Sequence, residues 1–381
     1  MPPRAPVNPS RCAILPPVPV PYREPLFARL AERGRLAIRV IYQAGAGAGW
    51  DQREDWFPER HAYPASSLRA WQRARPGRSP IALPRGLGQA LTAFDPACVV
   101  SWEYGPTTMR ALAWCRRRRR PLLVFSELTP HSDGELSPRR LRLHRLLARR
   151  VDGFVVASSA GRRRLEAMGV EPGRIEVALQ GADVERFRAV AAEHPADGPL
   201  RVLSVGRLVA DKGLDTLIEA FAEAGFEPGE AKLELCGAGP LEGELRELAR
   251  RLELPVTFTG YSSPDDLPNL YARAGALALV SSYEPFGVTV REAAAAGLPI
   301  VCGRTAGAAG DVAVEGENAL LVDPGERGQI AAALRRLARE PELRARLAAG
   351  SRAVTERHPL EADAEAWERA VLRALSARGP G

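Results

Sequence analysis

A repeated alternation of short apolar runs with amphipathic helical patterns constrains the fold of this chain more than any other feature. The alternation runs from residue 12 to residue 158, then restarts at residue 201 and continues to residue 303. Such a pattern predicts parallel β-sheets, because the helix between two parallel strands must cross over and cover a face of the sheet. We therefore expect an α/β protein with two doubly wound, Rossmann-like domains. The expected strands are 12–15, 36–42, 97–102, 121–127 and 151–158 in the first series, and 201–206, 232–237, 256–260, 276–282 and 299–303 in the second.

The length of the chain agrees with two domains. Its 381 residues exceed the size at which a single hydrophobic core usually keeps growing. The restart of the pattern indicates a first domain over residues 1–190 and a second over residues 191–358. The remaining segment, residues 359–381, holds a helical pattern with no strand after it. This helix can pack on either domain, and we expect it to return to the first.

Composition and cysteine usage exclude several classes of protein. Hydrophobic residues make up 45% of the chain and charged residues 26%, as in soluble globular proteins, which excludes wholesale disorder. The apolar runs are too short to span a membrane, and the first residues lack an apolar signal region. The five cysteines are odd in number and no pair has metal-ligand spacing. We therefore expect buried free thiols, no metal site and a cytoplasmic protein.

Charge divides the chain unevenly. Residues 1–190 carry 32 basic and 17 acidic side chains, whereas residues 191–381 carry 21 and 29. Arginines concentrate at residues 116–120 and 139–150, where RLRLHRLLARR also has an amphipathic helical pattern. Such a surface can lie on anionic lipid headgroups at the inner membrane face or bind a lipid diphosphate. The alternative is an ordinary solvated helix in an arginine-rich chain. We expect no nucleic-acid partner, because no recognition motif accompanies the charge.

A candidate anion-binding loop follows the strand expected at 201–206, where GRLVADKG leads into the helical pattern LDTLIEAF. A strand, a glycine turn and a helix start present free backbone N–H groups and the positive end of a helix dipole. Arg207 and Lys212 add two cations, and Lys212 is one of only two lysines among 53 basic residues. We interpret the loop as a phosphate site. The alternative is an ordinary turn with solvated charges.

A second glycine turn follows the next strand, with Gly237 and Gly239 before Pro240 and another helical pattern. Glycines there allow a close backbone approach to a ligand. They are equally what a tight turn between a strand and a helix requires, so both interpretations stay open.

The most specific motif is a pair of glutamates in SSYEPFGVTVREAAAAGLPIV. Glu284 follows a strand, the next residues open a helix, and Glu292 lies eight residues later on an otherwise apolar helix. A carboxylate on such a helix is costly to bury without polar partners. Sugar or ribose hydroxyls would be such partners. The alternative is a structural ion pair of Glu292 with Arg207 or Arg291.

Together these motifs resemble family 4 of the retaining glycosyltransferases, which have the GT-B fold. The resemblance rests on GRLVADKG, the G-x-G-P turn, FTGY, DLPNLYARAGALALVSSYEPFG with its E-x7-E pair, and EGENALLVDPGE, which follow one another over residues 200–330. It implies two Rossmann-like domains whose parallel sheets face each other across a cleft. It also implies a nucleoside diphosphate sugar as donor on the second domain, an acceptor on the first, and neither a cofactor nor an obligatory metal.

The implied activity is hexosyl transfer with retention of configuration, as in polysaccharide biosynthesis, to a glycan, a lipid-linked molecule or a small molecule. Arg207 and Lys212 would hold the donor diphosphate, and Glu284 would contact donor-sugar hydroxyls at the reacting centre. Glu292 would contact the ribose. The other donor contacts implied by the resemblance come from Gly237, Gly239, Phe286, Gly287 and Val288.

Two segments depart from the family pattern. Where many members carry a glycine pair in the first loop of the first domain, this chain has PPVPVPYREP, and proline lacks the backbone N–H. The usual Gly-Gly-x-x-Glu stretch is AGAAGDV here, with Gly307, Ala308 and Asp311 at the matching positions. The family's contacts in these two loops are therefore not carried over.

Candidates for the first domain's part of the catalytic site follow the strand at 121–127. Many relatives have a histidine near the reacting sugar here, and the nearest residues in SELTPHSDGE are Glu127 and His131. A solvated loop histidine is the alternative for His131. Two other functions fit the same architecture: a catalytically silent sugar-nucleotide sensor or partner subunit, and a related phosphorylase or epimerase. The retained Arg207, Lys212 and E-x7-E pair favour the transferase.

Overall fold

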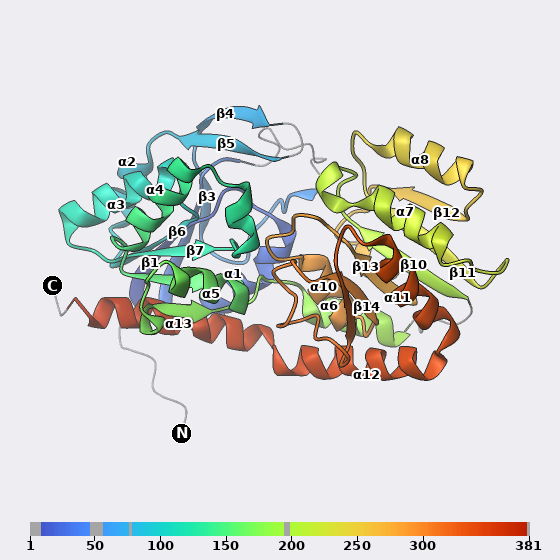
Figure 1. Ribbon diagram of the computed structural model, residues 1–381. Helices are drawn as coiled ribbons and strands as arrows, with labels where there is room; N and C mark the ends of the chain where they lie inside the picture. The colour runs from blue at the N-terminus through green and yellow to red at the C-terminus, as the bar shows by residue number, and fades with distance from the viewer. Residues whose placement is uncertain (1–8, 46–55, 76–77, 194–198, 379–381) are drawn as a thin grey trace, which may run out of the picture. The chain divides into compact units, whose positions relative to one another are not determined.

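The chain divides into two compact units (Figure 1). Residues 1–181 together with 360–381 form the amino-terminal unit, and residues 182–359 form the carboxyl-terminal unit. The boundary lies nearer residue 181 than the expected 190, because α6 (Val184–Glu193) packs on helices of the carboxyl-terminal unit. The computed structural model describes residues 9–45, 56–75, 78–193 and 199–378.

The amino-terminal unit is built on a parallel sheet in the order β3-β2-β1-β6-β7-β8-β9. A separate antiparallel pair, β4 with β5, lies in the stretch between β3 and α2. The strands are β1 (Ser10–Leu15), β2 (Leu36–Tyr42), β3 (Ala65–Ser67), β4 (Ala70–Arg75), β5 (Arg78–Pro84), β6 (Cys98–Trp102), β7 (Leu122–Ser126), β8 (Gly153–Val156) and β9 (Ile175–Val177). The helices are α1 (Glu24–Arg33), α2 (Leu87–Phe94), α3 (Pro106–Arg118), α4 (Pro138–Ala148), α5 (Ser159–Ala167) and α13 (Leu360–Ser376).

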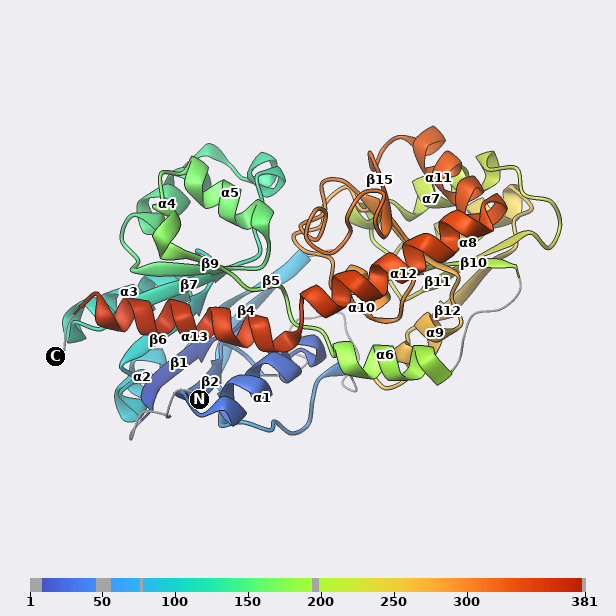
Figure 2. The same ribbon diagram turned by 90° about the horizontal axis from the view of Figure 1, so that it is seen from below.

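Helices cover both faces of this sheet, because successive side chains of a strand point to opposite faces. In β7, Val124 belongs to the core cluster that includes residues of α2 and α3. Its neighbour Phe125 stacks on Trp367 of α13, with ring centroids 5.4 Å apart. The last helix therefore completes the core of the amino-terminal unit, where it packs along β7, β8, β9 and α1 (Figure 2).

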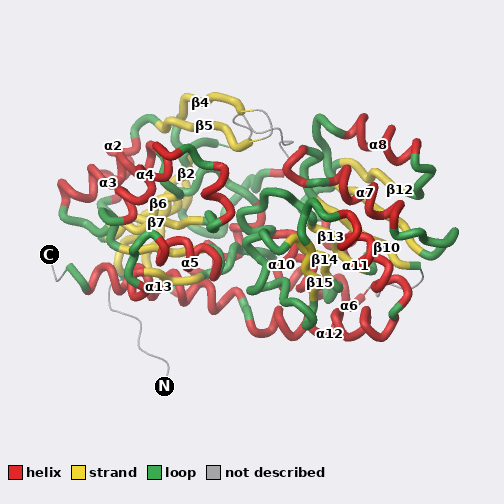
Figure 3. Tube along the Cα trace, viewed as in Figure 1, coloured by secondary structure: helices red, strands yellow, loops and turns green. Residues whose placement is uncertain are grey.

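The carboxyl-terminal unit is built on a second parallel sheet, in the order β12-β11-β10-β13-β14-β15. In both units helices flank the strands (Figure 3). The strands are β10 (Leu200–Val205), β11 (Ala231–Cys236), β12 (Val256–Gly260), β13 (Ala276–Leu279), β14 (Ile300–Gly303) and β15 (Ala319–Val322). Besides α6, the helices are α7 (Leu214–Glu223), α8 (Glu242–Arg251), α9 (Leu267–Ala272), α10 (Val288–Ala295), α11 (Arg327–Arg339) and α12 (Pro341–Arg357).

The structure confirms the expected pair of parallel-sheet, Rossmann-like domains and contains every strand that the sequence predicts. The sequence pattern missed the edge strands β3 and β9, which have three residues each and too few positions to show a periodicity. It also missed the edge strand β15 and the antiparallel pair of β4 and β5. The five cysteines are free and buried, as expected. Among the helices that the structure describes, none combines the length and the apolar character needed to cross a bilayer.

Candidate functional site

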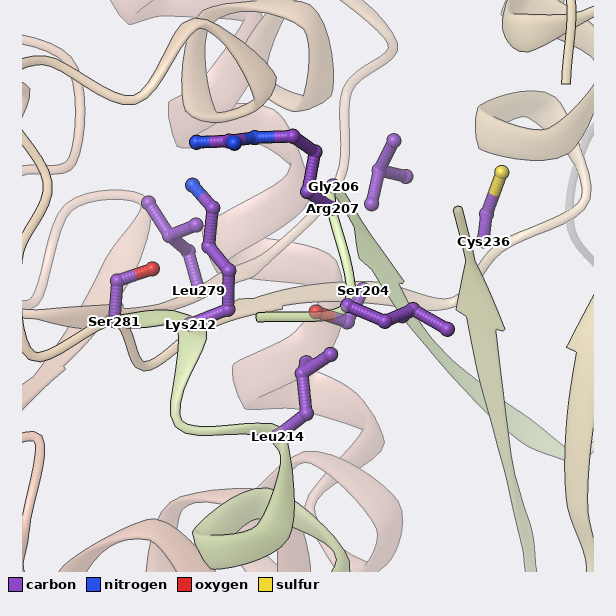
Figure 4. Close-up of a pocket in the computed structure, with 10 residues that line it drawn as sticks. Ser204, Gly206, Arg207, Lys212, Leu214, Cys236, Leu279 and Ser281 are labelled. Carbon is purple, nitrogen blue, oxygen red and sulfur yellow. The ribbon is translucent and has the colours of Figure 1, made fainter. Parts of the chain in front are cut away.

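A pocket of the carboxyl-terminal unit opens where the strand order of its sheet reverses. From β10 the chain proceeds outward to β11 and β12, then returns to β13 on the other side of β10. In an open α/β sheet such a switch point leaves a crevice at the carboxyl ends of the strands, where ligands bind. The pocket lies between the loops that follow β10 and β13 (Figure 4). It is lined by Ser204, Val205, Gly206, Arg207, Leu208, Lys212, Leu214, Cys236, Leu279 and Ser281.

The two cations expected to bind phosphate both line this pocket. In Figure 4 the charged ends of Arg207 and Lys212 extend toward the same side. The Lys212 Nζ donates to Glu284 Oε2 at 2.5 Å, and the two side chains are 20% and 12% exposed. The structure thus joins Lys212 and Glu284, two residues that the sequence singled out separately. An anion in the pocket would share Lys212 with a carboxylate that is already bound to it.

Gly237 and Gly239 pack their backbone against the loop that carries Arg207. The backbone N–H groups of Gly206 and Leu208 donate to the carbonyls of Cys236 and Ala238, each at 2.9 Å. A Cβ on Gly237 would lie 1.8 Å from the Gly206 oxygen, and one on Gly239 would lie 2.3 Å from the Leu208 oxygen. The close packing of the two loops therefore requires glycine at both positions, which agrees with the interpretation of a tight turn between a strand and a helix. Replacing either glycine would affect a ligand indirectly, by changing the shape of the loop that carries Arg207.

Glu292 is buried on α10, about one turn into the helix, which begins at Val288. The carboxylate is 8% exposed and accepts a hydrogen bond from the Tyr271 hydroxyl at 2.6 Å. Burial raises the pKa of Glu292 to about 7, although the Tyr271 hydrogen bond partly opposes this shift. Among the described residues of this unit, the partner of the Glu292 carboxylate is thus the Tyr271 hydroxyl. The alternative given above was an ion pair with Arg207 or Arg291.

A neighbouring loop holds the segment between Glu284 and α10 in place. The Gly307 N–H donates to the Glu284 carbonyl at 3.1 Å, and the Ala308 N–H donates to the Phe286 carbonyl at 2.8 Å. A Cβ on Gly307 would lie 1.9 Å from the Pro285 oxygen. The backbone of the AGAAGDV segment therefore supports the start of α10. The sequence pattern did not predict this structural role.

Buried hydroxyl groups around the same segment lack hydrogen-bond partners within the described residues. They are the Oγ of Ser281 after β13, the Oγ1 of Thr289 in the first turn of α10, and the Oγ1 of Thr305 after β14. Buried polar atoms of native proteins are almost always hydrogen-bonded, so each such atom needs an explanation. A polar ligand with several hydroxyl or phosphate oxygens would provide partners for them. Among the residues that the structure describes, no three metal-ligating side chains gather in one place.

In the amino-terminal unit, Glu127 lies in a half-buried polar network at the carboxyl end of β7. Its Oε1 accepts hydrogen bonds from Arg23 Nη2 at 2.9 Å and from Gln180 Nε2 at 2.6 Å. Arg23 is 6% exposed and also lies over the Trp102 ring, 4.3 Å from the centroid. Arg23 belongs to the PYREP segment, so this loop positions the Glu127 carboxylate. The sequence identified Glu127 and missed both of its partners.

Glu103 is a further carboxylate of this network. It follows β6 with a φ of 52°, which is uncommon for a residue other than glycine. Its two oxygens accept hydrogen bonds from the Ser126 hydroxyl at 2.8 Å and from the Glu127 N–H at 2.6 Å. Burial raises the pKa of Glu103 to about 7. His131 is the first residue of a 3₁₀ turn that follows this network, and its side chain is exposed. Of the two candidates in this loop, Glu127 thus belongs to the polar network, whereas His131 lies at the surface.

Two family profiles match the chain in succession. Residues 26–186 match the family described as Glycosyltransferase Family 4, and residues 186–354 match the family described as Glycosyl transferases group 1. Together the two matches extend over both parallel-sheet units. The chain therefore belongs to the group 1 glycosyltransferases that combine these two domains in a GT-B fold.

Curated relatives agree with this family. A glycogen synthase of Mycobacterium tuberculosis is 31% identical over 223 residues, which are 58% of this chain and 53% of the relative. An alpha-D-kanosaminyltransferase of Streptomyces kanamyceticus is 33% identical over 174 residues, 45% of each chain. The alignments thus span about half the length of these curated relatives.

Solved structures confirm the GT-B fold. HepE of Anabaena in complex with UDP superimposes with a TM-score of 0.76 at 20% identity, over 96% of this chain and 100% of that chain. WaaG, a glycosyltransferase involved in lipopolysaccharide biosynthesis, gives a TM-score of 0.67 at 18% identity, over 97% and 100%. At these identities the likeness concerns the fold.

Proposed function

We propose that this protein transfers a sugar from a nucleoside diphosphate donor to an acceptor, and that the pocket after β10 and β13 binds the donor. The observation that supports this most is the Lys212–Glu284 ion pair at a pocket also lined by Arg207. It joins cations suited to a diphosphate with a carboxylate suited to sugar hydroxyls. The Anabaena HepE complexes contain UDP, UDP with glucose, or UDP-glucose, which supports the same class of donor here.

In the proposed reaction, the bond between the sugar and the diphosphate breaks and negative charge grows on the departing diphosphate. Arg207, Lys212 and the free N–H groups at the start of α10 stabilise that charge without a divalent ion. Glu284, oriented by Lys212, accepts hydrogen bonds from the donor-sugar hydroxyls. Retention of configuration belongs to this proposal as the outcome that the family resemblance implies.

Glu292 is proposed to accept hydrogen bonds from the ribose hydroxyls. A carboxylate that accepts such bonds is stabilised in its ionised form, so ribose binding should lower the pKa that burial raises to about 7. Phe286, Gly287 and Val288 would contact the sugar or the phosphates through their backbone. In the amino-terminal unit, Glu127, His131 and the network around Glu103 are the proposed acceptor side of the reaction, with an acceptor that is a glycan, a lipid-linked molecule or a small molecule.

A two-stage measurement tests the function. A thermal-shift screen over nucleoside diphosphate sugars should identify a donor that raises Tm, whereas the matching free nucleoside should raise it less, because only the donor carries the diphosphate. Hydrolysis of that donor without an acceptor should then release nucleoside diphosphate. Binding without hydrolysis or transfer would favour the alternative of a sugar-nucleotide sensor or partner subunit. A protein whose Tm no sugar nucleotide changes would contradict the proposal.

A second prediction concerns divalent metal. Because Arg207 and Lys212 supply the positive charge that a divalent ion would bring to the diphosphate, donor hydrolysis should continue in excess EDTA. The control is the same assay with added magnesium or manganese. Loss of activity in EDTA that either ion restores would refute the proposed role of the two cations.

A third prediction concerns the arginine-rich surface of α4. Arg142, Arg145 and Arg149 are exposed, and Leu146 of α4 is 45% exposed. We expect the protein to bind vesicles that contain acidic lipids and not to bind neutral vesicles. The affinity for acidic vesicles should fall as the salt concentration rises. Changing the three arginines to glutamine should weaken vesicle binding and leave donor hydrolysis intact. If acidic vesicles do not bind the wild type at low salt, the arginines do not serve a membrane.

A further inference from the structure

A second concavity lies at the opposite edge of the carboxyl-terminal sheet, where the strands begin. It has a volume of about 370 Å³ and lies between the amino ends of the strands and one face of α12. The pocket proposed for the donor lies at the carboxyl ends of the same strands, so the two are separate. The cationic side chains of this amino-edge groove are Arg201, Lys232, Arg273, Arg344 and Arg352.

The charges of the amino-edge groove are unusual for this unit. Residues 182–359 carry 20 basic and 27 acidic side chains, yet no acidic residue lines the groove within the described part of the chain. Only one of its cations has an acidic partner there: Arg201 lies 3.8 Å from Glu234, close to the limit for an ion pair. Many other surface arginines of the unit are paired, as in Arg246 with Glu242 and Arg339 with Glu230.

The arrangement of the groove brings these cations together from several elements. Arg344 and Arg352 lie two turns apart on one face of α12, with Ala348 between them. Lys232, at the start of β11, and Arg273, which follows α9, also line the groove. The other lining residues are alanine, glycine, proline and one leucine, which offer no acidic or hydroxyl groups. Side chains of like charge repel each other in this position unless an anion lies between them.

We propose that the amino-edge groove binds a soluble small molecule that carries a phosphate group. Guanidinium groups match phosphate oxygens through paired N–H donors, and several of them around one concavity can hold a doubly charged phosphate. The apolar lining residues would accommodate the organic part of the molecule. This inference goes beyond the proposed transferase activity, because it concerns a site that neither the donor nor the reaction occupies.

The experiment measures binding of glycerol 3-phosphate by titration calorimetry at low ionic strength, without donor or acceptor. It uses Lys212→Ala protein, so that the donor pocket contributes less to the signal. This protein should bind glycerol 3-phosphate and should not bind glycerol. Adding Arg344→Ala and Arg352→Ala should weaken the affinity by on the order of tenfold or more, because two charge-assisted contacts are lost. Added salt should weaken binding in the parent protein.

The matched control adds Arg251→Ala and Arg346→Ala instead. These arginines are exposed, neither lines the groove, and Arg346 lies on another face of α12. The control has the same net charge as the groove variant and should retain the parent affinity. Equal loss in both variants, no loss in the groove variant, or no binding by the Lys212→Ala protein would overturn the proposal. Binding only to vesicles that carry phosphatidic acid would also overturn it, since the occupant would then be a lipid surface. None of these outcomes depends on transferase activity, so the two proposals are tested separately.

Discussion

Lys212→Ala should lower turnover by on the order of a hundredfold or more, with a smaller effect on donor affinity. Negative charge on the diphosphate grows as the sugar leaves, so the Lys212 ammonium stabilises the transition state more than the bound donor. The same substitution removes the cation from Glu284, which is only 12% exposed and accepts from Lys212 at 2.5 Å. Kinetic constants for donor hydrolysis, measured with and without acceptor, check this prediction.

The control for this variant is Arg250→Ala. Arg250 is an exposed arginine that pairs with Glu247 on α8, outside the proposed donor pocket. Both proteins should keep the Tm of the wild type within a few degrees, which separates a loss of chemistry from a loss of folding. A folded Lys212→Ala protein with nearly normal turnover would remove Lys212 from the proposed reaction.

Gly237→Ala should destabilise the carboxyl-terminal unit by about 2–4 kcal/mol. The residue has a φ of 144°, and the added Cβ would lie 1.8 Å from the Gly206 carbonyl oxygen, so the backbone of one loop would have to move. The Gly206 loop leads directly into Arg207, and donor affinity should therefore fall together with stability. Thermal unfolding with and without the donor measures both effects.

Gly243→Ala is the control, because here the same substitution should increase stability slightly. Gly243 lies in α8, and apart from its chain neighbours and the backbone of its own helix no atom comes within 4 Å of a Cβ built on it. Alanine is favoured over glycine in a helix by about 1 kcal/mol, so this variant should be slightly more stable than the wild type. Equal stability of the two variants would show that the close packing of the Gly206 and Gly237 loops is relaxed in solution.

The sequence predicted the fold well because the information lies in local patterns. Ten strands follow from apolar runs bounded by glycine and proline, and the parallel arrangement of the two sheets follows from the alternation of strands and helices. The motif residues Lys212 and Glu284 were also identified. Their ion pair was not, because it joins residues 72 positions apart, and nothing in either local segment specifies the other.

Other partners were missed for the same reason. Tyr271 lies 21 residues from Glu292, and Arg23 lies 104 residues from Glu127. Glu103 carried no local signal at all, since a single glutamate after a strand is common. A joint search for buried carboxylates at the carboxyl ends of adjacent strands would have drawn attention to Glu103 and Glu127, which follow the neighbouring strands β6 and β7.

The position of α13 has a consequence for the way the polypeptide acquires its structure during synthesis. The amino-terminal unit is made first, yet Trp367, which is 1% exposed, packs against Phe27 and Phe125 of that unit. Glu368, also fully buried, accepts two hydrogen bonds from Arg33 at 3.0 Å. These contacts cannot form until the ribosome has translated the whole of the intervening unit. Until α13 has been synthesised, the apolar face that it covers in the first unit is therefore left uncovered. The second unit is continuous in sequence and can complete its core before the first.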